Sequence, residues 1–122
     1  MITGAYGQVG FCLTQQAQTN GWDVLAIDRD TLDITDPQAV NALVKEYQPD
    51  VIINAAAHTA VDKAETEKDI AFDINGYAVG ALAAICKKRE TRLFHFSTDY
   101  VFNGKSAVPY KENDSTEPVN TY

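Results

Sequence analysis

Three glycines near the start of the chain, Gly4, Gly7 and Gly10, recur every third residue between a short apolar segment and an amphipathic run. Glycine adopts the positive φ angles of a tight turn and lets a ligand approach the backbone closely. Where a helix begins after such a turn, its unpaired N–H groups and its dipole favour phosphate. The spacing therefore predicts a site for a dinucleotide pyrophosphate, although a glycine triplet alone is also typical of an ordinary tight turn.

Acidic residues follow at the positions where such a site needs them. Asp28 stands eighteen residues past Gly10, where a carboxylate can accept both hydroxyls of an adenosine ribose. Arg29 comes next and could instead meet a 2′-phosphate, so NAD and NADP both stay open. Asp33 and Ile34 could offer a carboxylate and an apolar edge to the adenine. Taken alone, these residues are also typical of solvated turns.

Two later segments place small and polar residues where strands are expected to end. Three consecutive alanines, residues 55–57, leave room for a flat ring or a ribose, or for close helix-to-strand packing. His58 has a reference pKa suited to a general base, but it lacks a carboxylate at a fixed spacing, so we interpret it as structural or as a backbone-contact site. Further on, Thr98 and Asp99 put a hydroxyl and a carboxylate where a substrate would lie.

Apolar patterning predicts the elements that would position these residues. Strands and helices alternate, which indicates an α/β fold with a doubly wound parallel sheet and ligands at the carboxyl ends of the strands. Residues 1–2 are too few for a full first strand, so part of it is expected to be missing. We expect strands at 1–2, 23–27, 51–57 and 92–97, helices at 9–20, 36–48 and 70–85, and a loop after residue 102.

Composition narrows the classes of function. A chain of 122 residues suits one domain, here a Rossmann-like domain over residues 1–122, and is smaller than most complete α/β enzymes. With 10 basic and 17 acidic residues, the net charge of −7 argues against nucleic acid as a partner. No long apolar run indicates a membrane span, and no leader pattern opens the chain, so a cytoplasmic location is the default expectation.

The two cysteines, Cys12 and Cys86, are isolated in the sequence and lack the spacing of metal ligands. Both fall in helix-like surroundings. We therefore expect both to be buried small hydrophobic residues in a reducing compartment, and we predict no metal site.

Two segments carry a resemblance to a known family. Residues 55–65, AAAHTAVDKAE, and residues 97–102, STDYVF, resemble the extended short-chain dehydrogenase/reductases, and within them the dTDP-4-dehydrorhamnose reductase family. The similarity runs over nearly the whole chain. The first segment is long and particular to the reductase branch, whereas the glycine turn is shared across the superfamily.

The resemblance implies NADPH or NADH as cofactor, held by residues matched one by one to the family. The glycine turn, Gly4 to Gly10, would face the pyrophosphate through Gly7, Gln8 and Val9. The other implied cofactor contacts are Asp28 at the ribose, Asp33 and Ile34 at the adenine, and Ala57, His58, Thr59 and Tyr122 further along.

The resemblance also implies a reaction, the reduction of the 4-keto group of dTDP-4-dehydro-6-deoxy-L-mannose to give dTDP-L-rhamnose. Thr98 would bind and polarise the keto oxygen, Asp99 would hold sugar hydroxyls, and Tyr122 would donate the proton, with Asn75 matched to a proton-relay position. Ketone reduction needs such a hydrogen-bond donor and a proton source beside the oxygen.

The resemblance further implies a catalytic pair that this chain does not complete. A phenol titrates near pH ~10, so a nearby cation must lower its pKa. In the family a Lys lies four residues after the Tyr, beyond Tyr122, so this stretch is expected to be inactive alone and to lack a C-terminal substrate-binding part. A homodimer is possible for the full-length protein.

Three readings remain open from the sequence. Related sugar-nucleotide dehydratases carry Glu where this chain has Tyr100, so simple reduction is favoured over dehydration. A non-catalytic, nucleotide-binding regulatory subunit of the same fold is one alternative. Another extended-family enzyme acting on a nucleotide sugar, such as an epimerase, is the other.

Overall fold

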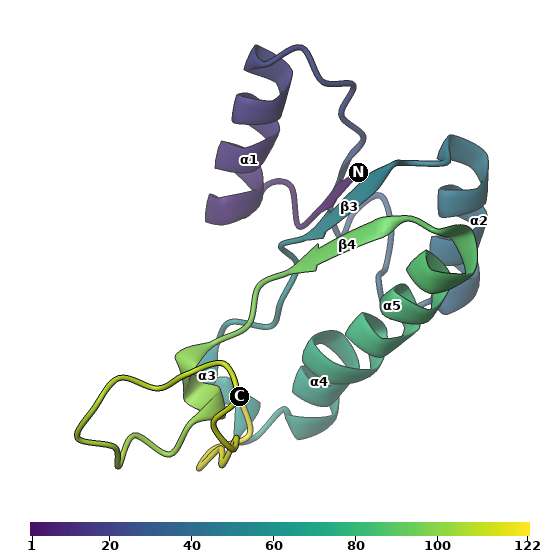
Figure 1. Ribbon diagram of the computed structural model, residues 1–122. Coiled ribbons are helices and arrows are strands. Elements are labelled where there is room, and N and C mark those ends of the chain that lie inside the picture. Colours follow the sequence, from purple (N-terminus) through teal and green to yellow (C-terminus); the bar gives the residue numbers. More distant parts are fainter.

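The computed structural model describes residues 1–122 as a four-stranded parallel sheet with helices on both faces (Figure 1). The strand order β2-β1-β3-β4 places β1 in the middle, paired to β2 on one side and to β3 on the other. The predicted doubly wound α/β fold is therefore confirmed. The strands are β1 (Ile2–Thr3), β2 (Ala26–Ile27), β3 (Val51–Asn54) and β4 (Arg92–His95).

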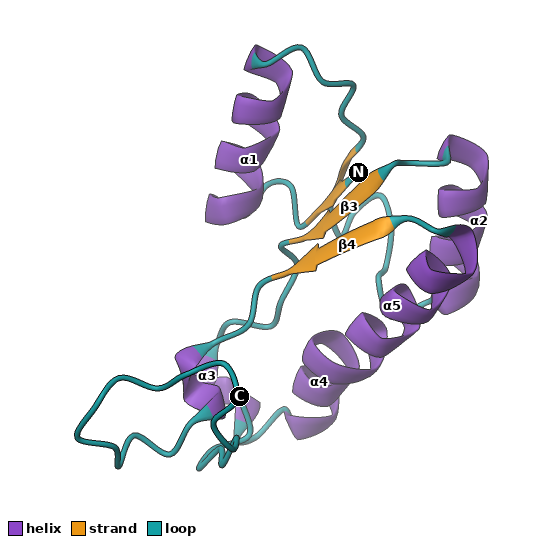
Figure 2. Cartoon of the chain, in the orientation of Figure 1, coloured by secondary structure: helices purple, strands orange, loops and turns teal.

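Helices cover the two faces unequally (Figure 2). Helix α1 (Gln8–Thr19) lies alone on one face, whereas α2 (Pro37–Tyr47) and α5 (Ala78–Arg89) pack side by side on the other. The core lies under this pair, where residues from both helices meet the sheet, because a sheet buries one apolar face against each layer. Its buried members are Met1, Ile27, Val40, Val44, Ile52, Leu82 and Cys86.

The predicted helix boundaries have local causes that the structure bears out. Asp36 caps α2, accepting hydrogen bonds from the backbone N–H groups of Gln38 at 2.9 Å and Ala39 at 3.0 Å, and Pro37 occupies the first helical position. Gly21 follows the end of α1 with a φ of 77°, as a left-handed cap requires.

The third predicted helix is longer and less regular than expected. It runs without a break from Lys68 to Arg89, through α4 (Lys68–Phe72), a π-helical turn (Asp73–Tyr77) and α5. The turn shifts the register of the side chains that follow it, and the apolar residues Ile70 and Tyr77 are exposed. By length and composition this helix could cross a membrane, which the sequence reading did not anticipate, although core helices of soluble proteins meet the same criterion.

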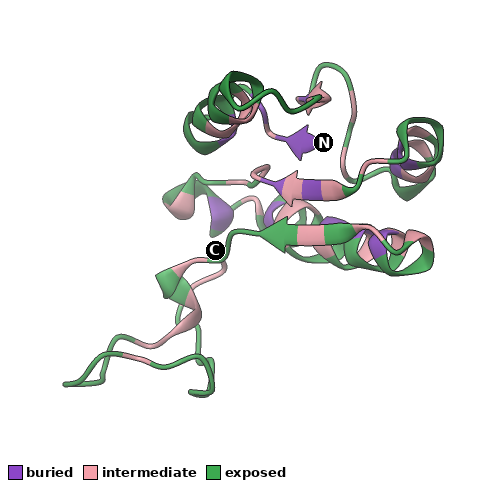
Figure 3. Ribbon diagram, turned by 45° about the horizontal axis from the view of Figure 1, so that its top comes forward, coloured by how far each residue is buried: buried purple, intermediate pink, exposed green.

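Burial differs from expectation on the α1 side (Figure 3). Gly10 is the one buried residue of α1, and Cys12 is exposed, so the prediction that both cysteines are buried is wrong for Cys12. Cys86 is buried, and burial raises the pKa of its thiol. The predicted strand at 23–27 shortens to β2 because the residues before Ala26 do not extend the pairing with β1.

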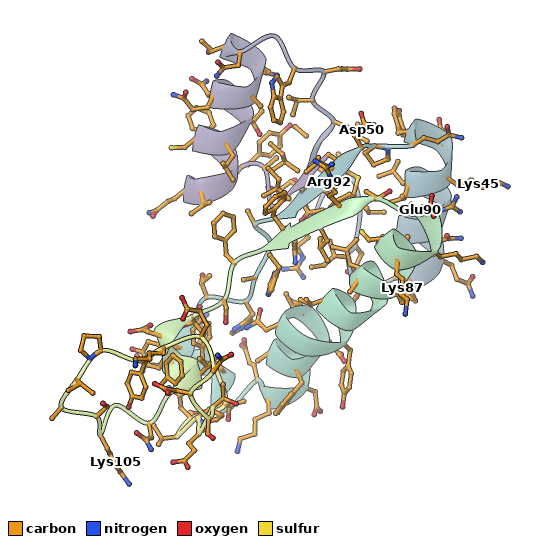
Figure 4. The ribbon with its side chains drawn as sticks, viewed as in Figure 1. Lys45, Asp50, Lys87, Glu90, Arg92 and Lys105 are labelled. Carbon is orange, nitrogen blue, oxygen red and sulfur yellow. The ribbon has the colours of Figure 1, made fainter.

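The two ends of the sheet differ in character. Beyond the carboxyl ends of β3 and β4 lie the short helix α3 (Val61–Ala64), the 3-10 turn Asp99–Val101 and the C-terminal loop (Figure 1). Around the opposite end, where β3 and β4 begin, charged side chains gather away from that loop (Figure 4). Those labelled there are Lys45, Asp50, Lys87, Glu90 and Arg92, whereas Lys105 lies out on the loop.

Candidate functional site

A cavity of about 930 Å³ opens at the carboxyl ends of the strands. Three stretches wall it: the glycine turn before α1, the segment after β2, and the loop after β3, with the start of the long helix completing one side. Of the predicted cofactor residues, ten line it: Gly4, Gly7, Gln8, Val9, Asp28, Asp33, Ile34, Ala57, His58 and Thr59. Gly10, Thr98, Asp99 and Tyr122 do not.

Each glycine of the turn has its own structural reason. Gly4 has a φ of 63°, and a Cβ there would lie 2.7 Å from the backbone of Ala56, so the turn can pass over the end of β3 only without a side chain. A Cβ on Gly10 would overlap the carbonyl of Gly4. The absence of a side chain at Gly10 therefore lets α1 pack against the turn. Gly7 lines the cavity, whereas Gly10 does not.

Asp28, which the sequence predicts as a ribose-binding residue, also forms hydrogen bonds that hold the local backbone. Its carboxylate accepts the backbone N–H of Tyr6 at 2.9 Å and that of Arg29 at 2.6 Å. The side chain thereby fastens the end of β2 to the glycine turn. A carboxylate has about four acceptor positions, so two stay available to ligand hydroxyls.

The segment after Asp28 forms the outer wall. Asp33 accepts the hydroxyl of Thr35 at 2.7 Å and its backbone N–H at 2.9 Å, and these hydrogen bonds, the hydroxyl first, hold the pKa of the Asp33 carboxyl below its ordinary value. The guanidinium of Arg29 is near enough to lower it slightly further. This wall of the cavity thus carries the cation of Arg29 together with the carboxylates of Asp28 and Asp33.

The loop after β3 is anchored to the long helix by Asn75. Its carboxamide accepts the N–H of His58 at 2.8 Å and donates to the carbonyl of His58 at 3.0 Å. The imidazole Nε2 lies 3.1 Å from the Glu67 carboxylate, and Nδ1 is buried without a partner. His58 therefore has a carboxylate partner that its sequence spacing did not predict, and its structural role stays a prediction. Sequence reasoning missed Glu67, nine residues away in no recognisable motif.

A polar network beneath the cavity was also missed. Asn54, buried at the end of β3, accepts the Thr3 hydroxyl at 2.5 Å and the N–H of Ala56 at 3.2 Å. Its amide nitrogen lies 3.1 Å from Nδ1 of His95 on β4. The network joins three neighbouring strands at their carboxyl ends. An asparagine inside a run of apolar strand residues was the one sequence feature that pointed to it.

The predicted catalytic residues Thr98 and Tyr122 do not line the cavity, and both lie close to one 3-10 turn, Asp99–Val101. The Thr98 hydroxyl accepts the N–H of Tyr100 at 3.2 Å and donates to Asp99 at 3.3 Å, which caps the 3-10 turn. The ring of Tyr100 meets that of Tyr122 edge to face, with centroids 5.5 Å apart. Tyr122 is therefore brought to the turn that carries Thr98, although 24 residues separate them.

The cavity wall fits a dinucleotide on three counts. Gly4 and Gly7 leave the backbone bare. Gly7 precedes α1 without any side-chain cap, so the first N–H groups of this helix have no partner within it. Asp28 keeps unused acceptor positions for hydroxyls.

The fold and this cavity define a Rossmann-like α/β protein with its site at the carboxyl ends of the strands. The chain belongs to the RmlD substrate binding domain family, whose match spans residues 1–122. A dTDP-4-dehydrorhamnose reductase of Burkholderia thailandensis is 45% identical over 122 residues, which are 100% of this chain and 41% of the relative.

Solved structures of dTDP-4-dehydrorhamnose reductases are similar to this chain over almost its whole length. A dTDP-4-dehydrorhamnose reductase from Clostridium acetobutylicum matches with a TM-score of 0.95 and 41% identity, over 99% of this chain and 43% of that one. The Bacillus anthracis dTDP-4-dehydrorhamnose reductase in complex with NADP matches with a TM-score of 0.94 and 38% identity, again over 99% and 43%. The chain thus spans about two fifths of the length of these proteins.

Proposed function

We propose that this chain is the cofactor-binding part of an enzyme that reduces the 4-keto group of dTDP-4-dehydro-6-deoxy-L-mannose to give dTDP-L-rhamnose, using NADPH or NADH. Family membership and the whole-chain similarity to reductases support the substrate. The single observation that carries the proposal is the contact of the Tyr122 ring with Tyr100, in the 3-10 turn that Thr98 caps, after the strand β4 whose carboxyl end lies at the same edge of the sheet as the glycine-lined cavity.

The chemistry assigned to this chain is binding and proton transfer. A reduced nicotinamide, when bound, supplies the hydride. The wall formed by Gly7, Gln8 and Asp28 holds the dinucleotide through backbone N–H groups and a carboxylate. As negative charge develops on the keto oxygen, the Thr98 hydroxyl donates to it once released from Asp99, and Tyr122 delivers the proton.

The proposal includes the cellular location, the partners and the oligomeric state of the enzyme. A nucleotide-sugar substrate and a soluble nicotinamide cofactor are small polar molecules, which supports action in the cytoplasm without nucleic acid or membrane partners. A homodimer is proposed for the full-length protein. Asp99, adjacent to Thr98 and exposed, is proposed to hold sugar hydroxyls.

The test is Tyr122→Phe in the full-length protein, followed by the oxidation of NADPH and NADH with the dTDP-keto sugar. The phenylalanine keeps the ring contact with Tyr100 but has no proton to give. We expect kcat to fall about 10²- to 10⁴-fold, the usual range for loss of a general acid, while the cofactor dissociation constant stays unchanged.

Three outcomes would count against the proposal. Unchanged turnover in Tyr122→Phe would remove Tyr122 as the proton donor. A wild-type protein that binds NADPH tightly but never oxidises it with this sugar would favour the regulatory subunit, whereas stereochemical inversion of the sugar without net reduction would favour the epimerase. Tyr47→Phe, at an exposed residue of α2, is the matched control and should keep full activity.

A further inference from the structure

A contact between two distant segments lies directly beside the proposed proton donor. Glu65 follows α3, and its carboxylate meets Thr121. One carboxylate oxygen accepts the backbone N–H of Thr121 at 2.7 Å, and the other accepts its hydroxyl at 3.1 Å. The backbone N–H and the hydroxyl of Thr121 therefore both donate to the Glu65 carboxylate. The residue after Thr121 is Tyr122.

The Glu65 end of this contact is firmly held. Ala64 is fully buried, and the N–H groups of Thr66 and Glu67 both donate to the carbonyl of Lys63, at 2.9 Å and 2.7 Å. Glu67 pairs with His58, whose loop lines the cavity. The carboxylate of Glu65 is thus carried by a segment that is fixed to the cavity wall.

The Tyr122 end has few other anchors. The N–H of Glu117 donates to the carbonyl of Val101 at 2.9 Å, and residues 118–120 then make no hydrogen bond. After this gap the chain meets Glu65 through Thr121, and Tyr122 meets the ring of Tyr100. Within residues 1–122, the contacts closest to the phenol are therefore the Glu65 contact at Thr121 and the ring of Tyr100.

We propose that Glu65 is a positioning residue for Tyr122, acting through the two hydrogen bonds that it accepts from Thr121. These bonds fix the position of the proton donor relative to the cavity wall. The inference rests on the proposed function and deepens it. A proton donor must stay within hydrogen-bond reach of the reacting oxygen, and a misplacement of about 1 Å can cost about 10²-fold in rate.

The charge state of Glu65 supports the contact at working pH. The backbone N–H of Thr121, then its hydroxyl, and to a smaller degree Lys68, hold the pKa of the Glu65 carboxyl below its ordinary value. A carboxyl whose pKa is lowered on folding contributes its full stabilisation above the unfolded pKa and loses it as the pH falls through the folded pKa. The contact is therefore intact at neutral pH.

The test uses the full-length protein and compares Glu65→Ala with and without Tyr122→Phe. In the wild-type background we expect Glu65→Ala to lower kcat about 10- to 100-fold, with the cofactor dissociation constant unchanged. In the Tyr122→Phe background it should have no further effect, because the group it positions is already gone. Thr121→Ser keeps both donors and should retain wild-type turnover.

Three results would overturn the inference. These are equal losses from Glu65→Ala in the two backgrounds, no loss in the wild-type background, or a loss confined to cofactor affinity. If Tyr122→Phe leaves turnover unchanged, the proposed function fails. If Tyr122→Phe lowers turnover but Glu65→Ala does not, only the inference about Glu65 fails. Asp62→Asn removes a neighbouring exposed carboxylate on α3 that makes no hydrogen bond, and it serves as the matched control.

Discussion

Asp28 illustrates how one side chain can serve the turn and the ligand together. Its carboxylate is already bonded to the backbone of Tyr6 and Arg29, so removing it entirely would loosen the glycine turn as well as the ribose site. Asp28→Ala would therefore weaken both cofactors and say little about their discrimination. Asparagine is the sharper change, because its oxygen can still accept from Tyr6.

We expect Asp28→Asn to weaken NADH more than NADPH, since the lost carboxylate would face the 2′-hydroxyl and an uncharged amide tolerates a 2′-phosphate. Arg29→Ala should do the opposite and weaken NADPH more. Each change is expected to alter affinity about 10- to 150-fold, the range for one hydrogen bond to a charged group. Isothermal titration of both variants with both cofactors measures this, and parallel losses for the two cofactors would contradict it.

Residue types and short spacings made much of the cavity wall predictable. Gly4, Asp28 and His58 all line it because they follow strands whose carboxyl ends share one edge of the sheet. The Glu65 contact with Thr121 was not predictable in this way. It joins residues 56 positions apart through the path of a loop, and no periodic pattern encodes such a path.

At the scale of elements, the end of the sheet depends on Asn54. Asn54→Ala leaves the Thr3 hydroxyl without its partner and the N–H of Ala56 without its acceptor, both at buried or half-buried positions. An unsatisfied buried polar group costs about 1–3 kcal/mol, so we expect the free energy of unfolding to fall by at least that amount. Urea denaturation of the full-length protein measures it.

Asn113→Ala is the matched control for that change, because Asn113 is exposed in the C-terminal loop and makes no hydrogen bond. Its unfolding free energy should stay within about 0.5 kcal/mol of the wild-type value, as is usual for exposed positions. If both variants unfolded at the same urea concentration, the network would have no role in stability.

Patterning predicted the helices better than the strands, for physical reasons. The Asp36-Pro37 start and the Gly21 cap are local devices, so three or four residues decide them. Strand lengths depend on partners far along the chain, and β2 pairs over two residues only. The π-helical turn likewise follows no sequence period, which is why Tyr77 lies on the exposed side.

At the scale of the whole molecule, residues 1–122 leave the α1 face of the sheet uncovered over β4. Leu93 packs against the core under α2 and α5, and successive strand residues point to opposite faces, so Phe94 points to the α1 side. Helix α1 contacts β1 and does not reach β4 (Figure 3). Phe94 is accordingly 58% exposed and Phe96 53% exposed.

We therefore expect a polypeptide of residues 1–122, made by itself, to bind an apolar dye such as ANS and to self-associate, because contiguous exposed apolar surface favours association. Phe94→Lys should lower dye binding and shift sedimentation toward the monomer, with the far-ultraviolet circular dichroism unchanged. Phe72→Lys, at an equally exposed aromatic residue on α4, should leave self-association as it is. Equal effects of the two changes would mean that general surface charge, and not the face of β4, governs association.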